Sequence, residues 1–140
     1  MNKKVHKLVV DEPDDLFLFG LVTNENDYRL SWQMNQHLGI ELVRADDAQV
    51  KLKGMIHDFV QYVFFDENRF LQFSFFKNKS SQNAYLIAEH KSCDYFFCIQ
   101  GSMMDELEKM LKELKEIPVI SMVVKIDVQS LKSRKNLVFL

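Results

Sequence analysis

The chain has 140 residues, 47% of them hydrophobic and 27% charged, and its formal net charge is −2. This size and composition predict a single domain over residues 1–140 that buries its core without disulfides or a structural metal. The slightly negative net charge argues against sequence-independent nucleic-acid binding, which needs surplus Lys and Arg. No apolar stretch approaches the roughly 18 residues that span a bilayer.

The start of the chain does not read as an export signal. Residues 1–10 contain lysines but no long apolar segment, and residues 11–15 are almost all acidic. A signal peptide needs a basic start followed by an apolar stretch. We therefore expect a cytoplasmic protein whose two cysteines, Cys93 and Cys98, stay reduced. Both are expected to be small buried hydrophobic residues rather than metal ligands.

Two strands and a helix are predicted in the first part of the chain. Residues 3–10 and 17–22 are rich in β-branched and apolar residues, which is typical of strands. Residues 27–38 predict a helix, because Asn and Asp residues precede it and apolar residues recur within it at four-residue intervals. Gly39 stands where such a helix would end in a left-handed residue.

The middle of the chain predicts several short strands and no long helix. The segments 58–65 and 70–76 are the clearest, and we expect a hairpin between them. In the second of them, alternating apolar and polar residues indicate a half-buried antiparallel strand. The other strand candidates are residues 40–44, 49–53, 84–88, 94–100 and 119–126.

A second helix is predicted from Ser102, with an apolar stripe that runs from Met103 to Leu114 and an end before Pro118. Short turns between strands imply antiparallel neighbours. The predicted fold class is therefore α+β: a mostly antiparallel β-sheet of about seven strands with two α-helices packed on one face. The apolar end of the chain, residues 137–140, is expected to dock on this domain.

One segment resembles a family motif. Residues 87–95 are similar to the motif that names the bacterial IPExxxVDY family, with matches at Ile87, Glu89, Asp94 and Tyr95. Ala88 stands where the family has Pro, and Cys93 where it has Val. Residues 27–35 and 125–133 also look like the family, so the resemblance spans most of the chain. It implies no activity, cofactor or catalytic residue.

The motif has two interpretations. In the structural one, Glu89 and Asp94 accept hydrogen bonds from backbone N–H groups and fix a corner between two strands. In the functional one, they are a carboxylate pair for acid–base chemistry or a metal, with His90 beside them for proton transfer. The second interpretation gives the alternative hypothesis of a small-molecule-binding protein or enzyme with a site near Glu89, His90 and Asp94.

The predicted first helix carries a candidate interface. Tyr28, Arg29 and Trp32 combine aromatic rings with an arginine, which is the composition of an interface hot spot. The competing interpretation packs Tyr28 and Trp32 on the sheet and leaves Arg29 in solvent, because a lone Trp in a small domain is usually buried. The sequence leaves both interpretations open.

The chain lacks the common nucleotide-binding and hydrolase motifs, and its histidines have no metal-ligand spacing. We therefore assign no catalytic residue, cofactor or metal. The lack of these motifs favours a non-enzymatic protein, and an enzyme stays the alternative hypothesis. The leading hypothesis is a protein-interaction or accessory module whose partner is another protein or a second copy in a homodimer. The resemblance also implies genes near those of ribonuclease III and pyruvate kinase, which hints at an accessory role. An RNA-associated accessory factor is a third and weaker hypothesis, because the chain has no surplus of basic residues.

Overall fold

The computed structural model describes residues 16–102 and 104–137. The predicted strand over residues 3–10 lies outside the described residues, as do residues 138–140. In chain order the elements are β1 (Leu16–Thr23), α2 (Asp27–Leu38), β2 (Val43–Arg44), β3 (Ala48–Leu52), β4 (Met55–Phe59), β5 (Gln61–Asp66), β6 (Leu71–Lys77), the 3₁₀ turn η2 (Ala88–His90), β7 (Tyr95–Gln100), α3 (Met104–Lys115), β8 (Ile120–Ile126), and the 3₁₀ turns η3 (Val128–Ser130) and η4 (Lys132–Leu137).

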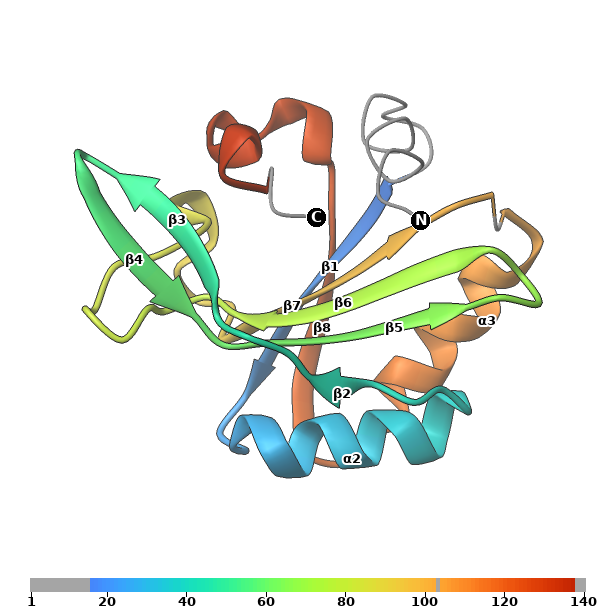
Figure 1. The fold of residues 1–140 in the computed structure, drawn as a ribbon. Helices are drawn as coiled ribbons and strands as arrows, with labels where there is room; N and C mark the ends of the chain where they lie inside the picture. The colour runs from blue at the N-terminus through green and yellow to red at the C-terminus, as the bar shows by residue number, and fades with distance from the viewer. Residues whose placement is uncertain (1–15, 103, 138–140) are drawn as a thin grey trace.

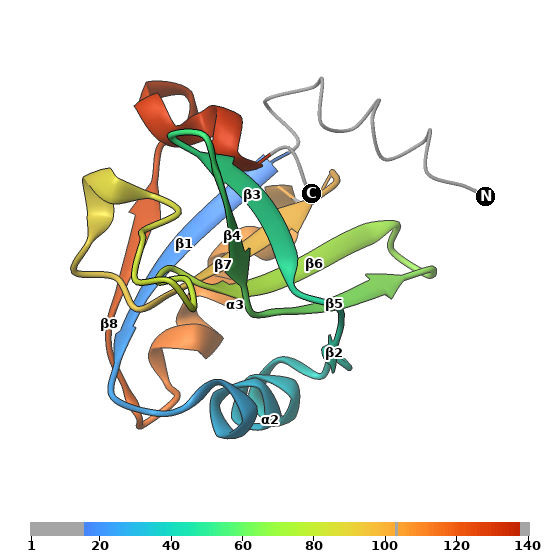
Figure 2. The same ribbon diagram turned by 60° about the vertical axis from the view of Figure 1, so that its left-hand side comes forward.

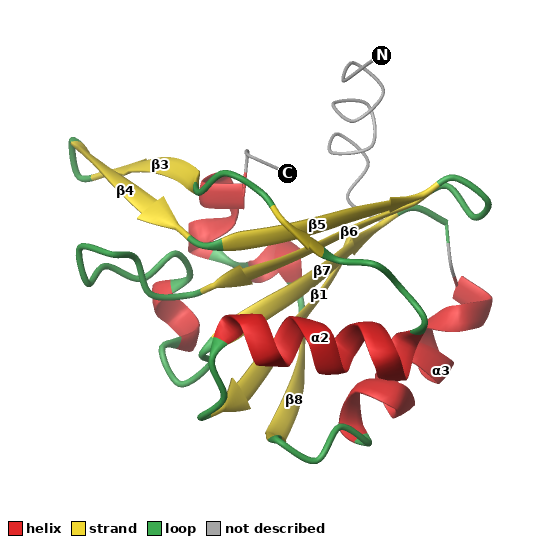
Figure 3. Ribbon diagram, turned by 60° about the horizontal axis from the view of Figure 1, so that its bottom comes forward, coloured by secondary structure: helices red, strands yellow, loops and turns green. Residues whose placement is uncertain are grey.

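One antiparallel sheet forms the centre of the molecule. It has six strands in the order β2-β5-β6-β7-β1-β8, and β3 and β4 form a separate antiparallel pair. Both α-helices lie against the same face of the six-stranded sheet (Figures 1 and 3). The predicted α+β class, with a mostly antiparallel sheet and two α-helices packed on one face, is confirmed.

The local signals of α2 act as predicted. The side chain of Asn26 accepts a hydrogen bond from the backbone N–H of Arg29 at 2.9 Å and so caps the helix start. Gly39 ends the helix with φ of +66°, a left-handed conformation that glycine adopts without a steric cost. Leu30, Met34 and Leu38 form its buried stripe.

Aromatic rings tie the strands together on the helix-covered face. Phe73 of β6 stacks with Phe64 of β5 at 6.0 Å between ring centroids and with Phe97 of β7 at 5.7 Å. One layer along, Phe75 contacts Tyr62 at 5.7 Å and Tyr95 at 5.1 Å. Such cross-strand pairs stabilise a sheet beyond the area they bury, and they explain where much of the Phe-rich composition goes.

The opposite face of the sheet carries a second core. Phe59, Phe76, Phe96 and Cys98 are buried there, together with Leu137 near the end of the chain. The β3–β4 pair projects from the sheet as an arm on this side, and the 3₁₀ turns η3 and η4 lie above the same face (Figure 2). Leu137 therefore docks as expected, although the residues after it are not described.

Three strand predictions need correction. Residues 58–65 are not one strand: β4 ends at Phe59 and β5 begins at Gln61, because the chain passes there from the arm into the sheet. Residues 84–88 form no strand, since only Tyr85 makes an isolated bridge, to Lys79, before the chain turns into η2. Of residues 40–44, only Val43 and Arg44 are strand, because the side chain of Asn35 takes up both backbone groups of Leu42.

Candidate functional site

The four motif residues have separate structural environments. Ile87 is fully buried in the second core, and Tyr95 is buried in the core beneath the helices. Glu89 and Asp94 are exposed. The motif is therefore split between two faces of the sheet, and its side chains do not converge on one point.

Both carboxylates of the motif are occupied by hydrogen bonds to the backbone. Asp94 Oδ2 accepts from the N–H of Thr23 at 2.9 Å, which joins the start of β7 to the end of β1. Glu89 Oε2 accepts from the N–H of Ser133 at 2.8 Å. This is the arrangement that the structural interpretation expects, in which the carboxylates fix a corner of the fold.

Tyr95 also makes a long-range contact. Its hydroxyl donates to the backbone carbonyl of Glu25 at 2.7 Å, in the segment just before α2. Burial raises the pKa of this phenol well above its usual range, and the nearby carboxylates, with Asp27 first among them, act in the same direction. Tyr95 thus stays a neutral hydrogen-bond donor at ordinary pH.

Asn78 organises the motif segment, and sequence reasoning missed it. Its side-chain amide is fully buried and donates to the carbonyls of His90 and Cys93, each at 3.0 Å, with a longer contact to Ile87. Its Oδ1 accepts from the N–H of Ile87 at 2.9 Å. The only available signal was an Asn directly after a strong strand, a position where such side chains often bond to local backbone.

Glu89, His90 and Asp94 do not form a catalytic constellation. Glu89 points to Ser133, and Asp94 to Thr23. A hollow of about 370 Å³ is lined by Asp94, but neither Glu89 nor His90 is part of its lining. In the parts of the chain that the structure describes, no group of three or more His, Cys, Asp or Glu residues is placed to hold a metal ion.

The hollow at Asp94 is rich in lysine. Lys77, Lys79 and Lys91 line it. Two of these ammonium groups lie near the ring of Tyr85, with Lys91 Nζ 5.6 Å and Lys79 Nζ 6.0 Å from its centroid. Glu25 also lines the hollow and bonds to the N–H of Asn26. An ammonium beside an aromatic ring is favourable, yet two of them on one ring concentrate positive charge.

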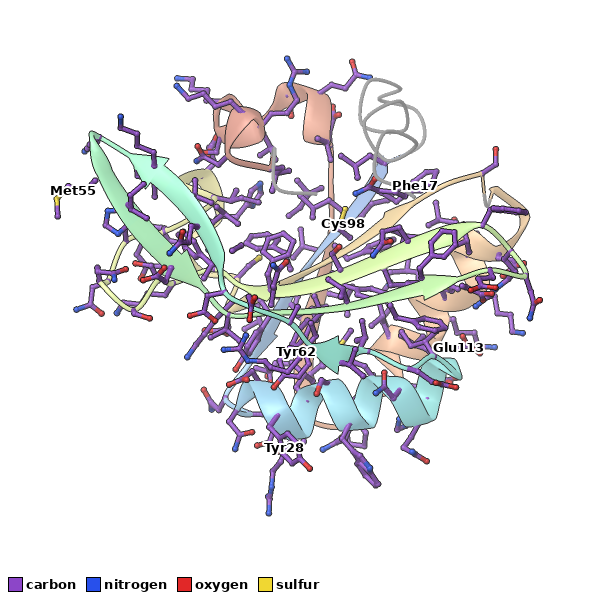
Figure 4. The ribbon with its side chains drawn as sticks, in the orientation of Figure 1. Phe17, Tyr28, Met55, Tyr62, Cys98 and Glu113 are labelled. Carbon is purple, nitrogen blue, oxygen red and sulfur yellow. The ribbon has the colours of Figure 1, made fainter. Side chains whose placement is uncertain are left out.

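Both cysteines are free and buried. Burial raises the pKa of the Cys98 thiol, and burial with the charge of Asp94 raises that of Cys93. Cys93 stands before β7 rather than on it, and both thiols pack in the second core. Figure 4 labels Cys98, which lies above the sheet.

Tyr28, Arg29 and Trp32 lie together on the outer face of α2. Tyr28 is 72% exposed and Trp32 is 59% exposed, and Arg29 is exposed between them. Figure 4 shows Tyr28 pointing away from the sheet. The interpretation that packs both rings on the sheet is therefore wrong, because Leu30, Met34 and Leu38 already fill the inward side.

The spacing could have revealed this orientation. Residues two positions apart on a helix lie about 200° apart around its axis, so Tyr28 and Trp32 face away from the stripe that contains Leu30 and Met34. A shallow hollow of about 450 Å³ is lined by Tyr28, Arg29, Trp32 and Gln33. We call these four residues the α2 outer patch.

No protein-family model matches the chain, and no curated protein sequence matches it. Membership of the IPExxxVDY family stays a prediction that rests on the residues quoted above. Among the described helices, none is both long and apolar enough to cross a membrane.

Proposed function

We propose that this chain is a protein-interaction module that binds a partner protein through the α2 outer patch. The observation that carries the proposal is the exposure of Tyr28 and Trp32, one helical turn apart, on a helix whose buried stripe is already complete. Two large rings in water leave apolar area that a partner can cover.

The composition of the α2 outer patch also favours binding. Aromatic rings supply large contact area at a small loss of side-chain entropy, and Arg is enriched with Trp and Tyr among the residues that dominate interface energies. Arg29 makes no side-chain hydrogen bond or salt bridge within the described part of the chain, so its guanidinium is available to a carboxylate or carbonyl of the partner.

Affinity capture of the tagged protein from its native cells tests the proposal. We expect one partner near equal stoichiometry, and we expect Trp32→Ala or Arg29→Ala to reduce its recovery at least tenfold, as truncation of a hot-spot residue does. Phe70→Ala is the matched control, because Phe70 is 75% exposed and lies in the β5–β6 turn, away from α2. Recovery that survives loss of both Tyr28 and Trp32 would refute the proposal.

The hollow at Asp94 supports a second candidate function, binding of a small anionic molecule. Lys77, Lys79 and Lys91 line it, while the carboxylates of Asp94 and Glu25 are held by backbone N–H groups. Titration with inorganic phosphate, followed by amide chemical shifts, tests it. We expect saturable shifts around Tyr85 that vanish in Lys79→Ala/Lys91→Ala and persist in Lys51→Ala/Lys53→Ala; shifts that do not saturate would exclude a site.

A further inference from the structure

In the part of the chain that the structure describes, strand β8 is an edge of the six-stranded sheet. Among the described strands it pairs only with β1, and it has seven residues, whereas β2 at the opposite edge has two. A long edge strand presents a row of N–H and C=O groups that another strand can pair with. Its exposed side chains are Ser121, Met122 and Lys125, and Met122 is 58% exposed.

The register shows which backbone groups of β8 face outward. The carbonyl of Leu21 accepts from the N–H of Asp94, at the start of β7, so Leu21 directs its backbone groups to the β7 side. Neighbouring residues of a strand direct their backbone N–H and C=O groups to opposite sides of the strand, so those of Gly20 form hydrogen bonds with β8. Gly20 is opposite Val124. Val124 is therefore bonded to β1, and the N–H and C=O of Val123 face the open edge.

We propose that β8 joins two copies of this chain, which pair antiparallel about Val123 and continue the sheet across the dimer. Antiparallel pairing about Val123 is self-complementary. It places Val123 opposite Val123 of the second copy, and Met122 opposite Val124, on the face where Met122 is exposed. Lys125 falls opposite Ser121 of the second copy, so no like charges meet.

A second copy matches this edge in its backbone groups and in its exposed side chains. Between Ser121 and Lys125, each outward N–H of one copy lies opposite an outward C=O of the other copy. This holds because the two strands have the same length and the same alternation of outward and inward groups. It also covers two Met122 side chains with two Val124 side chains, which removes apolar area from water. The α2 outer patch belongs to a different element, so this inference does not depend on the proposed function.

Sedimentation of the full chain tests the dimer. We expect a mass about twice the 16.6 kDa of the chain, and about half that mass for Val123→Pro, which removes an outward N–H without touching the bonds to β1. Val123→Thr keeps the N–H and should remain dimeric. Trp32→Ala should also remain dimeric, which separates this contact from the one under "Proposed function".

Amide hydrogen exchange on the unmodified chain is a second readout that needs no folded variant. We expect slow exchange at Val123 and Lys125 in the dimer, and at least tenfold faster exchange there on dilution to monomer, while Val124 stays protected throughout. A monomer at all concentrations overturns the proposal. A dimer whose Val123 amide exchanges freely also overturns the proposal. A monomer in which another segment protects that amide overturns it as well.

Discussion

Glu89 accepts two hydrogen bonds from Ser133, 44 positions along the chain, one from the backbone N–H at 2.8 Å and one from the hydroxyl. They join η2 to the first turn of η4. Partial desolvation alone would raise the pKa of Glu89, but the bonds from Ser133 outweigh it and hold the pKa below its usual value. The carboxylate therefore anchors the C-terminal turns in its charged form.

The first prediction concerns this anchor. Glu89→Ala should speed exchange of the Ser133 amide about tenfold, because a hydrogen bond to a charged group stabilises by roughly 1.5 kcal/mol. Since the folded pKa is lowered, the stabilisation is present above the unfolded pKa of about 4.3 and is lost as the pH falls through the folded value. Glu108→Ala, on the exposed side of α3, is the control; unchanged exchange in Glu89→Ala would contradict the anchor.

The second prediction concerns Asn78. Replacement by Ala removes the side-chain partner of the Ile87 N–H and of the Cys93 carbonyl, both in a buried site. The His90 carbonyl loses one bond and keeps the one from the N–H of Cys93. We expect the free energy of unfolding to fall by roughly 2–4 kcal/mol, measured by urea denaturation. Asn24→Ala, at an exposed position, should change it by less than about 0.5 kcal/mol. A loss this small at Asn78 would show that water replaces the amide.

The third prediction concerns the close approach of Gly20 and Cys93. A Cβ at position 20 would collide with the Cys93 sulfur and would lie 3.2 Å from a methyl group of Ile126. Gly20→Ala should therefore destabilise the protein by about 1–3 kcal/mol. Cys93→Ala removes the sulfur, so the double variant Gly20→Ala/Cys93→Ala should be more stable than the sum of the two single changes implies. Additive free energies of unfolding would contradict this contact.

The fourth prediction concerns the phenol of Tyr62, which donates to Asp27 Oδ2 at 2.7 Å. Desolvation, and then the bond and charge of Asp27, raise the pKa of Tyr62 from 10.0 to about 12. Because the folded pKa is raised, the stabilisation is complete below the unfolded value of 10.0 and is lost as the pH rises toward 12.

Tyr62→Phe should lower stability by about 1 kcal/mol at neutral pH and should weaken its decline above pH 10. Urea midpoints over this pH range, with tyrosinate absorbance, measure both effects. Tyr28→Phe is the control, because the ring of Tyr28 is exposed on α2. An alkaline decline that is identical in Tyr62→Phe and the unmodified chain would show that other groups cause it.

Local patterns were enough to predict much of this fold. The helix over residues 27–38 matches α2 at both ends, since Asn26 and Gly39 act through their own side chain and backbone. The alternation of residues 70–76 predicted a strand, and β6 forms there with Phe73 and Phe75 under the helices. The expected half-burial is wrong, because Ser74 is also buried and Phe76 packs in the second core on the other face. Each of these signals depends on neighbours in the chain, so it can be read without the tertiary structure.

Long-range contacts decided the rest. The strand expected over residues 84–88 does not form, because Asn78 binds the backbone before η2, at Ile87, and after it, at Cys93. Glu89, His90 and Asp94 are close in sequence, but Ser133 and Thr23 draw the two carboxylates to different places. The sequence by itself determined the α+β class and the main periodic elements; only the tertiary structure decided which polar groups pair, because their partners lie from 9 to 71 positions away and no local pattern marks them.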